Sequence, residues 1–310
     1  MSVLLRLLAV AWPILSAAAV EQPPAAGSFS IASYNLENYC DRPTGTRPVK
    51  SEVSKSKIRE ALVKLDADIL AVQEMGSLEA LEELRTSLRT EGLDYPHWEF
   101  VNGVDTNIHV AILSRFPITA RRAHTNDGFL LNGRRFRISR GIAEVDIRVS
   151  RDYRLTLLAA HLKSRREVPE ADQAELRKQE AVLLRRFVDE RLDADPDTHL
   201  AVVGDFNDVR NSSPIKILLG RGTHTLFDTR PTERSGDSAN NLNPRLPPRD
   251  VAWTHYYATE ETYSRIDYIL VSRSMAQTLD RSGTSVLAFQ DWGLASDHRP
   301  ILARFFRKTD

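Results

Sequence analysis

The chain has 310 residues, of which 42% are hydrophobic, so it is long enough to bury the core of one large domain. Its 42 basic and 42 acidic side chains give a net charge of zero, which argues against a protein that attracts polyanions through its overall charge. The single cysteine, Cys40, excludes an internal disulfide, so the fold must be stable through its core alone.

The first 19 residues have the features of a secretory signal peptide. One arginine precedes an apolar run, and small residues follow up to Ala19, as at an A-x-A cleavage site. An uncleaved membrane anchor is the alternative, but Pro13 interrupts the run, which is shorter than the ~20 residues that span a bilayer. We therefore expect cleavage near Ala19 and a secreted or periplasmic monomer without a stable membrane anchor, whose single domain covers 28–308.

Short apolar runs alternate with amphipathic stretches along the rest of the chain, which is typical of an α/β protein. The predicted strands are "FSIASYN" (29–35), "DILAVQE" (68–74), "HVAILSRFPI" (109–118), "RFRISRGIAEVDIRV" (135–149), "LTLLAAHL" (155–162), "HLAVVGDF" (199–206), "SRIDYILVS" (264–272) and "RPILARFF" (299–306). The predicted helices lie around 51–65, 77–90 and 170–193, with a shorter one at 213. This order predicts two sheets with helices outside them. The Pro-, Asn- and Ser-rich stretch 229–250 predicts an inserted loop, and "VAWTHYY" (251–257) is a candidate pocket wall.

One segment, 115–140, is locally basic. Both a solvated arginine-rich face and a phosphate-binding patch are consistent with this composition. Asp127 is the only acid among seven arginines: Arg115, Arg121, Arg122, Arg134, Arg135, Arg137 and Arg140.

Polar residues stand where the predicted strands end or begin. Burying a charge at such a place is costly unless the charge is paired or binds a metal. Taken singly, these residues have structural explanations: Asp205 and Asn207 could cap the helix at 213 or form an Asx-turn, and Asp267 could pair with Arg265. Their joint occurrence favours one shared polar site. The residues concerned are Asn35, Glu74, His161, Asp205, Asp267, Asp297 and His298.

Part of this set suits a metal-assisted attack of water on a phosphate ester. Mg²⁺ prefers carboxylates together with water and phosphate oxygens, which Glu74 with Asn35 or Asp297 can provide. Asp205 suits the base that acts on the attacking water, and Asn207 suits the group that orients it. We expect Mg²⁺ as the cofactor, with Mn²⁺ as an alternative.

The remaining residues suit stabilisation of the phosphoryl oxygens. Charge that develops on these oxygens needs donors, and His298 and His161 are available. Asp267 would keep His298 charged and oriented. We expect three further cations to bind the substrate: Lys163, Arg140 and Arg265.

Six motifs together resemble those of the endonuclease/exonuclease/phosphatase superfamily. "YNLEN", "VQE", "AAHLKS", "GDFND", "RIDYIL" and "SDHRP" occur in the order and approximate spacing of that superfamily, over about 28–306. It contains DNase I-like nucleases, apurinic-site endonucleases, inositol polyphosphate 5-phosphatases and bacterial sphingomyelinases. The resemblance implies a four-layer α/β/β/α sandwich with the site at one rim of the two sheets. It also implies Glu74 as the main metal ligand, assisted by Asn35, with Asp297 next to the metal.

The resemblance implies roles for the phosphate side of the site as well. Asp205 positions or deprotonates the attacking water beside Asn207. His298 contacts the scissile phosphate with Asp267 behind it, and His161 contacts phosphate or protonates the leaving group.

These observations lead us to expect an exported Mg²⁺-dependent phosphodiesterase that cleaves DNA or RNA. A sphingomyelinase-like or inositol-phosphate enzyme is the alternative, although the sequence predicts no exposed aromatic-rich hairpin that would enter a membrane interface. A catalytically dead phosphate binder does not fit, because each matched position holds a competent side chain.

Overall fold

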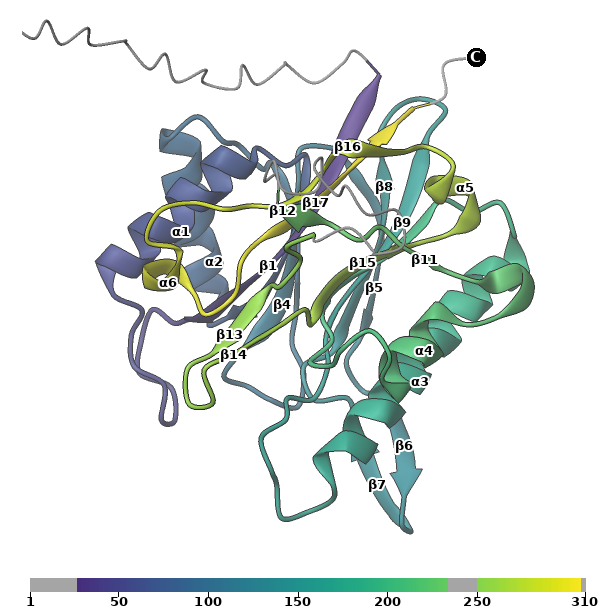
Figure 1. Ribbon diagram of the computed structural model, residues 1–310, viewed down its shortest axis with the longest axis horizontal. Helices are drawn as coiled ribbons and strands as arrows, with labels where there is room; N and C mark the ends of the chain where they lie inside the picture. Colours follow the sequence, from purple (N-terminus) through teal and green to yellow (C-terminus); the bar gives the residue numbers. More distant parts are fainter. Residues whose placement is uncertain (1–26, 234–249, 308–310) are drawn as a thin grey trace, which may run out of the picture.

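The computed structural model describes residues 27–233 and 250–307, and Figure 1 shows two sheets packed face to face between helices. The first sheet contains, in spatial order, β12 (Thr232–Glu233), β16 (Leu279–Val286), β17 (Ile301–Phe306), β1 (Ser28–Tyr39), β2 (Ile69–Met75), β4 (His109–Ser114) and β3 (His97–Val101). The second contains β11 (Phe227–Asp228), β15 (Asp267–Val271), β10 (Leu200–Asp205), β9 (Arg154–His161), β8 (Ile142–Arg148) and β5 (Ile118–His124).

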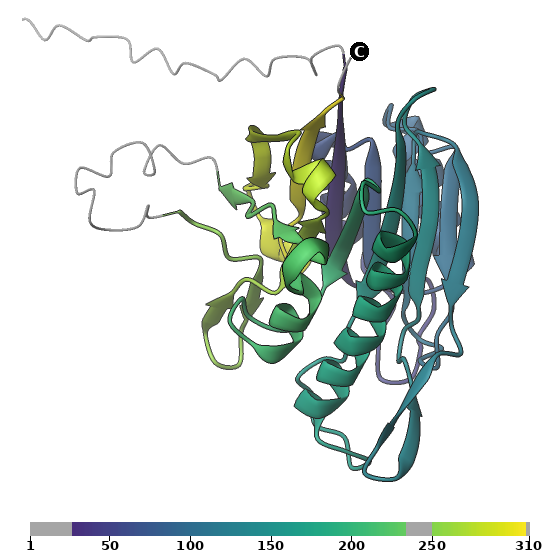
Figure 2. The same ribbon diagram turned by 90° about the vertical axis from the view of Figure 1, so that its right-hand side faces the viewer.

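Helices cover the outer face of each sheet (Figure 1), and Figure 2 shows one of these two helical faces from the front. α1 (Glu52–Leu65), α2 (Leu78–Thr90) and the short α6 (Trp292–Ala295) pack on the first sheet. α3 (Gln173–Ala194) and α4 (Ser213–Leu219) pack on the second. The short η1 (Gly222–His224) connects α4 to β11, and the short α5 (Arg273–Ala276) connects β15 to β16. The predicted α/β/β/α sandwich is therefore confirmed.

Alternation along the strands produces three apolar layers. On β1, Phe29 and Ile31 face the core between the two sheets, while Ala32 and Tyr34 face α1 and α2. A third core lies between the second sheet and α3, where Leu158 and Val202 are fully buried. Both sheets are thus covered on both faces, which explains why their strands read as nearly continuous apolar runs.

The expected elements are largely present, and the differences have local causes. The run 135–149 is not one strand: β7 (Arg134–Arg137) forms a hairpin with β6 (Gly128–Leu131), and β8 begins only after Gly141, whose φ of 71° turns the chain. β3, β16 and the hairpin of β13 (His255–Tyr257) with β14 (Thr262–Ser264) were not predicted. Of the expected loop 229–250, the residues 234–249 lie outside those described, as does the whole predicted leader.

Strand direction places one end of each sheet at a common edge. β1 runs parallel to β2, and β9 runs parallel to β10, so these four strands end there. β15 and β17 run antiparallel to β10 and β1, so they begin at the same edge. None of the helices in the described part of the chain is long and apolar enough to cross a membrane.

Candidate active site

Asp205 lies at the centre of the polar cluster. It is the last residue of β10, and the sheet register sets it beside His161 of β9 on one side and Asp267 of β15 on the other. Gly204 makes this approach possible: its φ is 139°, and a Cβ there would lie 1.9 Å from the carbonyl oxygen of Ala160. Only glycine fits this position, which explains the glycine that precedes the aspartate in "GDFND".

Hydrogen bonds hold the Asp205 carboxylate from two sides. The backbone N–H of Asn207 donates to Oδ1 at 2.8 Å, and the Asn35 amide donates to Oδ2 at 3.0 Å, which joins the two sheets. Burial raises the pKa of Asp205 to about 7, the cation of His298 opposes this rise, and the negative charge of Asp267 adds to it. A carboxyl group with a pKa near neutrality is suited to general-base catalysis.

His298 lies between two carboxylates. Its Nδ1 is 2.8 Å from Oδ2 of Asp267, and its Nε2 is 3.7 Å from Oδ2 of Asp205. Burial alone would lower the pKa of His298, but the charges of Asp267 and Asp205 outweigh burial and raise the pKa well above its ordinary value. The predicted pairing of His298 with Asp267 is therefore present, and it presents a cation to the site.

His161 differs from His298 in charge. Its Nε2 is 3.4 Å from Oδ2 of Asp205, while Nδ1 is buried and has no hydrogen-bond partner in the described structure. Burial lowers the pKa of His161 well below its ordinary value, and the positive charges of Arg140 and His298 lower it further. The site thus combines one neutral and one charged imidazole within reach of the same carboxylate.

Carboxylate oxygens that could bind a metal lie on the side of Asn35 away from Asp205. Oε2 of Glu74 accepts a hydrogen bond from the backbone N–H of Asn38 at 2.9 Å, and Oε1 lies 3.4 Å from the Asn35 amide nitrogen. Glu37, which sequence reasoning missed, joins them: burial raises its pKa, and the charges of Asp297 and Glu74 raise it further although Lys50 opposes them. These mutually repelling carboxylates fit a divalent cation such as Mg²⁺, because its charge would offset the repulsion.

Backbone strain also marks this side of the site. Glu74, at a β-bulge of β2, has a φ of 61°, and Glu37 has a φ of 48°. Residues other than glycine rarely adopt such values, which cost on the order of 1–3 kcal/mol and cluster at functional sites.

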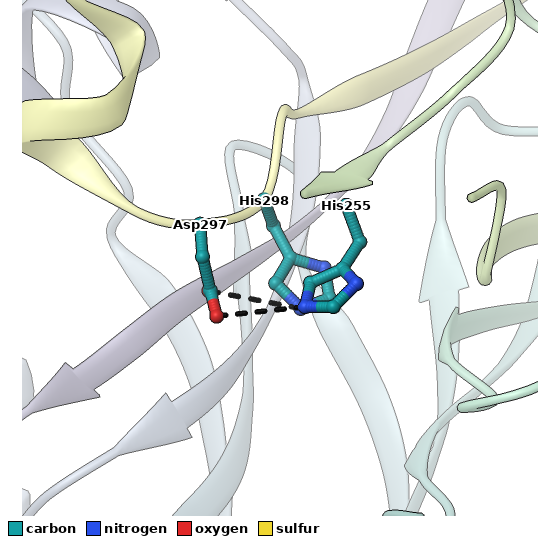
Figure 3. Close-up of side chains that lie close together, drawn as sticks. All are labelled: His255, Asp297 and His298. Atoms are coloured by element: carbon teal, nitrogen blue, oxygen red, sulfur yellow. Dashed lines mark ion pairs between the residues drawn. The ribbon is translucent and has the colours of Figure 1, made fainter. Parts of the chain in front are cut away.

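Asp297 and His255 form the outer wall of the site, which Figure 3 shows with His298. Nε2 of His255 is 3.5 Å from Oδ2 of Asp297, and Nε2 of His298 is 3.9 Å from Oδ1. Burial would raise the pKa of Asp297, but the hydrogen bond from His255 and the charge of His298 outweigh it and lower that pKa. His255 comes from the expected pocket wall 251–257, but nothing in its own sequence context indicates that it reaches Asp297.

The three expected substrate-binding cations are in different situations. Both Nη atoms of Arg265 donate to Asp228, at 3.1 and 2.6 Å, so its charge is already compensated and it does not pair with Asp267. Nζ of Lys163 donates to the carbonyl oxygens of Ser164 and Arg166. These contacts favour structural roles for both residues, and their part in substrate binding stays a prediction.

Arg140 remains a better candidate for substrate binding. One Nη donates to the carbonyl oxygen of Leu162 at 2.9 Å, which places the guanidinium beside the strand end that carries His161. Nε is buried and has no hydrogen-bond partner in the described residues, although it lies 4.0 Å from Oδ2 of Asp105. A phosphate oxygen would satisfy such a group, since a buried unpaired donor is otherwise costly.

The basic segment 115–140 does not form one patch. Arg115 pairs with Asp66 and Asp68, Arg121 with Glu99, and Arg122 with Glu144 and Asp146. The other exposed arginines lie on the β6–β7 hairpin, where no acidic partner is found among the described residues. In both views the hairpin extends past the edge where β9 ends (Figures 1 and 2). These hairpin arginines are Arg134, Arg135 and Arg137.

A surface hollow lies beside this hairpin. Its volume is about 550 Å³, and it is lined by the loop 101–104, by 123–126 and by Arg137. It contains none of the site residues, but Gly103 in its wall packs directly on the backbone of Arg140. The hollow therefore borders the backbone of Arg140.

The β13–β14 hairpin corrects an expectation. The sequence predicts no exposed aromatic-rich hairpin, yet Tyr257 and Tyr263 are 45% and 58% exposed on this one. Trp253 packs against Tyr263 and Trp292, with ring centroids 4.8 and 5.0 Å apart. The aromatic residues are separated in sequence, and they become one cluster only through the pairing of β13 with β14.

Comparisons with known proteins agree with this geometry. The model of the endonuclease/exonuclease/phosphatase family matches residues 32–298. No curated protein sequence matches the chain.

Solved structures with the same fold include three of different function. Truncated TDP2 of Caenorhabditis elegans has 16% identity and a TM-score of 0.59, over 90% of this chain and 97% of its own. Sphingomyelinase C from Streptomyces griseocarneus has 16% identity and a TM-score of 0.60, over 90% and 100%. The 3′ phosphatase NExo (D146N) from Neisseria, bound to a product DNA hairpin, has 18% identity and a TM-score of 0.58, over 89% and 99%. At these identities the likeness concerns the fold alone.

Proposed function

The chain belongs to the endonuclease/exonuclease/phosphatase family of hydrolases, and on that premise we propose that it is an exported, Mg²⁺-dependent phosphodiesterase that cleaves nucleic acid. The observation that carries the chemistry is the Asp205 carboxylate, held by Asn35 and Asn207 between a neutral His161 and a charged His298. A base and a cation within a few ångströms of each other suit the in-line attack of water on phosphorus.

Each residue has one task in this mechanism. Asp205 accepts the proton of the attacking water, and the amide of Asn207, 3.4 Å from Oδ2, helps to orient that water. His298 neutralises charge that develops on a phosphoryl oxygen, while Asp267 holds its imidazolium in place. Neutral His161 donates a hydrogen bond to a phosphate oxygen or the leaving oxygen.

Glu74, Glu37, Asn35 and Asp297 would hold the metal ion. Their oxygens suit Mg²⁺, and Mn²⁺ is a related alternative. When bound, the ion supplies a Lewis acid that polarises a phosphoryl oxygen.

A polyanionic substrate is supported by the β6–β7 hairpin. Three arginines without acidic partners extend past the strand ends, and a hollow leads from Arg137 toward Arg140. Phosphate contacts of this kind supply most of the affinity for nucleic acid. DNA and RNA both offer the necessary repeated phosphates.

A lipid phosphodiester is the second candidate, and the tyrosines of the β13–β14 hairpin favour it. Tyr257 and Tyr263 are amphipathic side chains exposed beside Asp297, as suits contact with a membrane interface. The hairpin carries no long apolar run, so this observation is weaker than the unpaired arginines.

Export is proposed from the leader alone. The residues 1–19 combine an apolar run with a small-residue cleavage pattern. Mass spectrometry of the mature protein should find an N-terminus near Val20.

A substrate panel tests the proposal. We expect purified protein with Mg²⁺ to cleave plasmid DNA or RNA in preference to sphingomyelin vesicles and inositol phosphates, and excess EDTA to abolish turnover, because all proposed ligands are oxygens. Full activity in EDTA would refute the metal-assisted mechanism. Preference for sphingomyelin would replace the nucleic-acid assignment by the lipid one.

A further inference from the structure

We propose that His255, Asp297 and His298 form an inhibitory site for a transition-metal ion of the zinc type, which shares only Asp297 with the oxygen-rich site at Glu74. One ligand atom from each of the three residues lies within 4.8 Å of the others. The binding of the metal stands on this geometry, and only its inhibitory effect rests on the proposed function.

Backbone pairing brings the two histidines together. His255 and His298 face each other in an isolated antiparallel bridge, although they are 43 residues apart. The N–H of Tyr256 donates to the carbonyl oxygen of Asp297 at 3.0 Å, and the N–H of Arg299 donates to that of Thr254 at 2.7 Å. The imidazole rings lie 4.6 Å apart, and both approach the same carboxylate in Figure 3.

The carboxylate of Asp267 orients the ring of His298 for metal binding. Nδ1 of His298 is fixed at 2.8 Å from Asp267, so Nε2 is the nitrogen available to a metal; it lies 3.9 Å from Asp297 and 3.7 Å from Asp205. Histidines that bind metals nearly always donate the other ring N–H to a carboxylate or carbonyl in this way. A metal would have to displace the proton on Nε2, so we expect binding that is reversible and weaker than in a structural zinc site.

The ligand types select against Mg²⁺. Two imidazole nitrogens and one carboxylate oxygen are the set found in open zinc sites, whereas Mg²⁺ requires oxygen ligands. Zn–N distances of about 2.0–2.1 Å would draw the ligand atoms somewhat closer than they are here. His255 is on a short hairpin strand at the surface, so its ring can make that adjustment.

Occupation of this site would stop the proposed reaction in two ways. The metal would take Nε2 of His298, which then no longer presents its N–H to the phosphate. It would also engage Asp297, which the proposed Mg²⁺ site shares. Zinc should therefore inhibit even when Mg²⁺ is abundant.

The test compares the wild-type protein with His255→Asn, which removes one of the three proposed zinc ligands and retains Asp297 and His298. Isothermal titration with ZnCl₂, without substrate, should give one binding event in the wild type that is weakened at least about tenfold in the variant. The zinc concentration that halves turnover, measured relative to each protein's own turnover with Mg²⁺ alone, should rise by a similar factor.

A matched control is His224→Asn. His224 also lies near two carboxylates, 3.5 Å from Asp189 and 3.7 Å from Asp193, but in a different part of the molecule. The His224→Asn protein should bind zinc with the affinity of the wild type, and zinc should inhibit it to the same extent. His255→Gln serves as a second variant should the thermal midpoint of His255→Asn fall.

Equal zinc affinity in wild type and both His255 variants would overturn the inference. So would zinc inhibition that depends on His224. The calorimetric result stands apart from the proposed function, because a protein inactive on every substrate in the panel would still show or lack the His255-dependent binding.

Discussion

At the scale of single residues, the environment of Asp205 decides which of two explanations of "GDFND" applies. The carboxylate does accept the N–H of Asn207, as in an Asx-turn, but its other oxygen is directed at Asn35, His161 and His298. Capping alone would not place it among these groups. The turn and the site use different oxygens of one side chain.

Replacing Asp205 by Asn should separate these two functions. The amide keeps the size and most hydrogen bonds but is not a base, so turnover should fall by ~10²-fold or more while the thermal midpoint hardly changes. Steady-state kinetics and thermal unfolding on the same sample measure both. Asp208→Asn is the control: Asp208 pairs with Arg177, so its loss should lower stability more than turnover. A stable Asp205→Asn protein with near-normal turnover would disprove the assignment.

The pH dependence of turnover should be bell-shaped. Asp205 must be ionised, and burial raises its pKa to about 7, so kcat/KM should rise with pH through that region. His298 must be protonated, and Asp267 and Asp205 raise its pKa well above the ordinary value, so kcat/KM should fall again at higher pH. In Asp267→Asn the alkaline limb should move to lower pH, because a negative charge that favours the imidazolium is gone. An unchanged alkaline limb would exclude His298 as the titrating acid.

At the scale of elements, the site depends on how closely β9 and β10 approach. Gly204→Ala would place a Cβ 1.9 Å from a backbone oxygen of β9, which neither strand can relieve by a side-chain rotation. We expect the free energy of unfolding to fall by about 1–3 kcal/mol or more. Turnover should also fall, because a shift of the backbone at Gly204 would displace Asp205, the next residue in the chain. Gly222→Ala is the control, because it too has a positive φ but no atom within 4 Å.

The sequence could predict the convergence of strand ends but not the contacts made by hairpins. His161 and Asp205 follow apolar runs that form parallel neighbours, so the rule that parallel strands end at one edge brings them together, as it does Asn35 and Glu74 on the other sheet. His255 belongs to a short polar strand whose partner residues 297–299 are distant in sequence, and no local pattern encodes that pairing. Glu37 was missed because it lies two residues beyond the predicted strand 29–35.

Proximity in sequence also misled the interpretation of the arginines. Seven arginines within 115–140 read as one basic cluster, but β4, β5 and the β6–β7 hairpin carry them to different places. Acidic partners from other segments of the chain neutralise Arg115, Arg121 and Arg122. Only the fold determines which arginines keep their charge available.

At the scale of the whole molecule, neutral overall charge makes any attraction of polyanions a local property. Arg134, Arg135 and Arg137 replaced together by Ala should weaken nucleic-acid binding and flatten its dependence on salt, because fewer counterions are released. The chemical step should survive. Binding measured across a range of salt concentrations, with single-turnover rates at saturation, separates the two effects.

The matched control uses Arg148, Arg151 and Arg154. These exposed arginines lie where β8 ends and β9 begins, at the opposite end of the sheet from Asp205. Replacing all three by Ala removes the same charge and should leave the salt slope as in the wild type. If both triple variants change the slope equally, the hairpin has no special part in binding.

The position of β17 in the middle of the first sheet has a consequence for how the protein is made. The segment that supplies Asp297 and His298 immediately precedes this strand, and β17 inserts between β16 and β1. A nascent chain on the ribosome can therefore already contain Asn35, Glu74 and Asp205 while it still lacks the cation that faces them. The catalytic centre is completed only when β17 has inserted, so a nascent chain that has not yet reached this strand lacks the proposed activity.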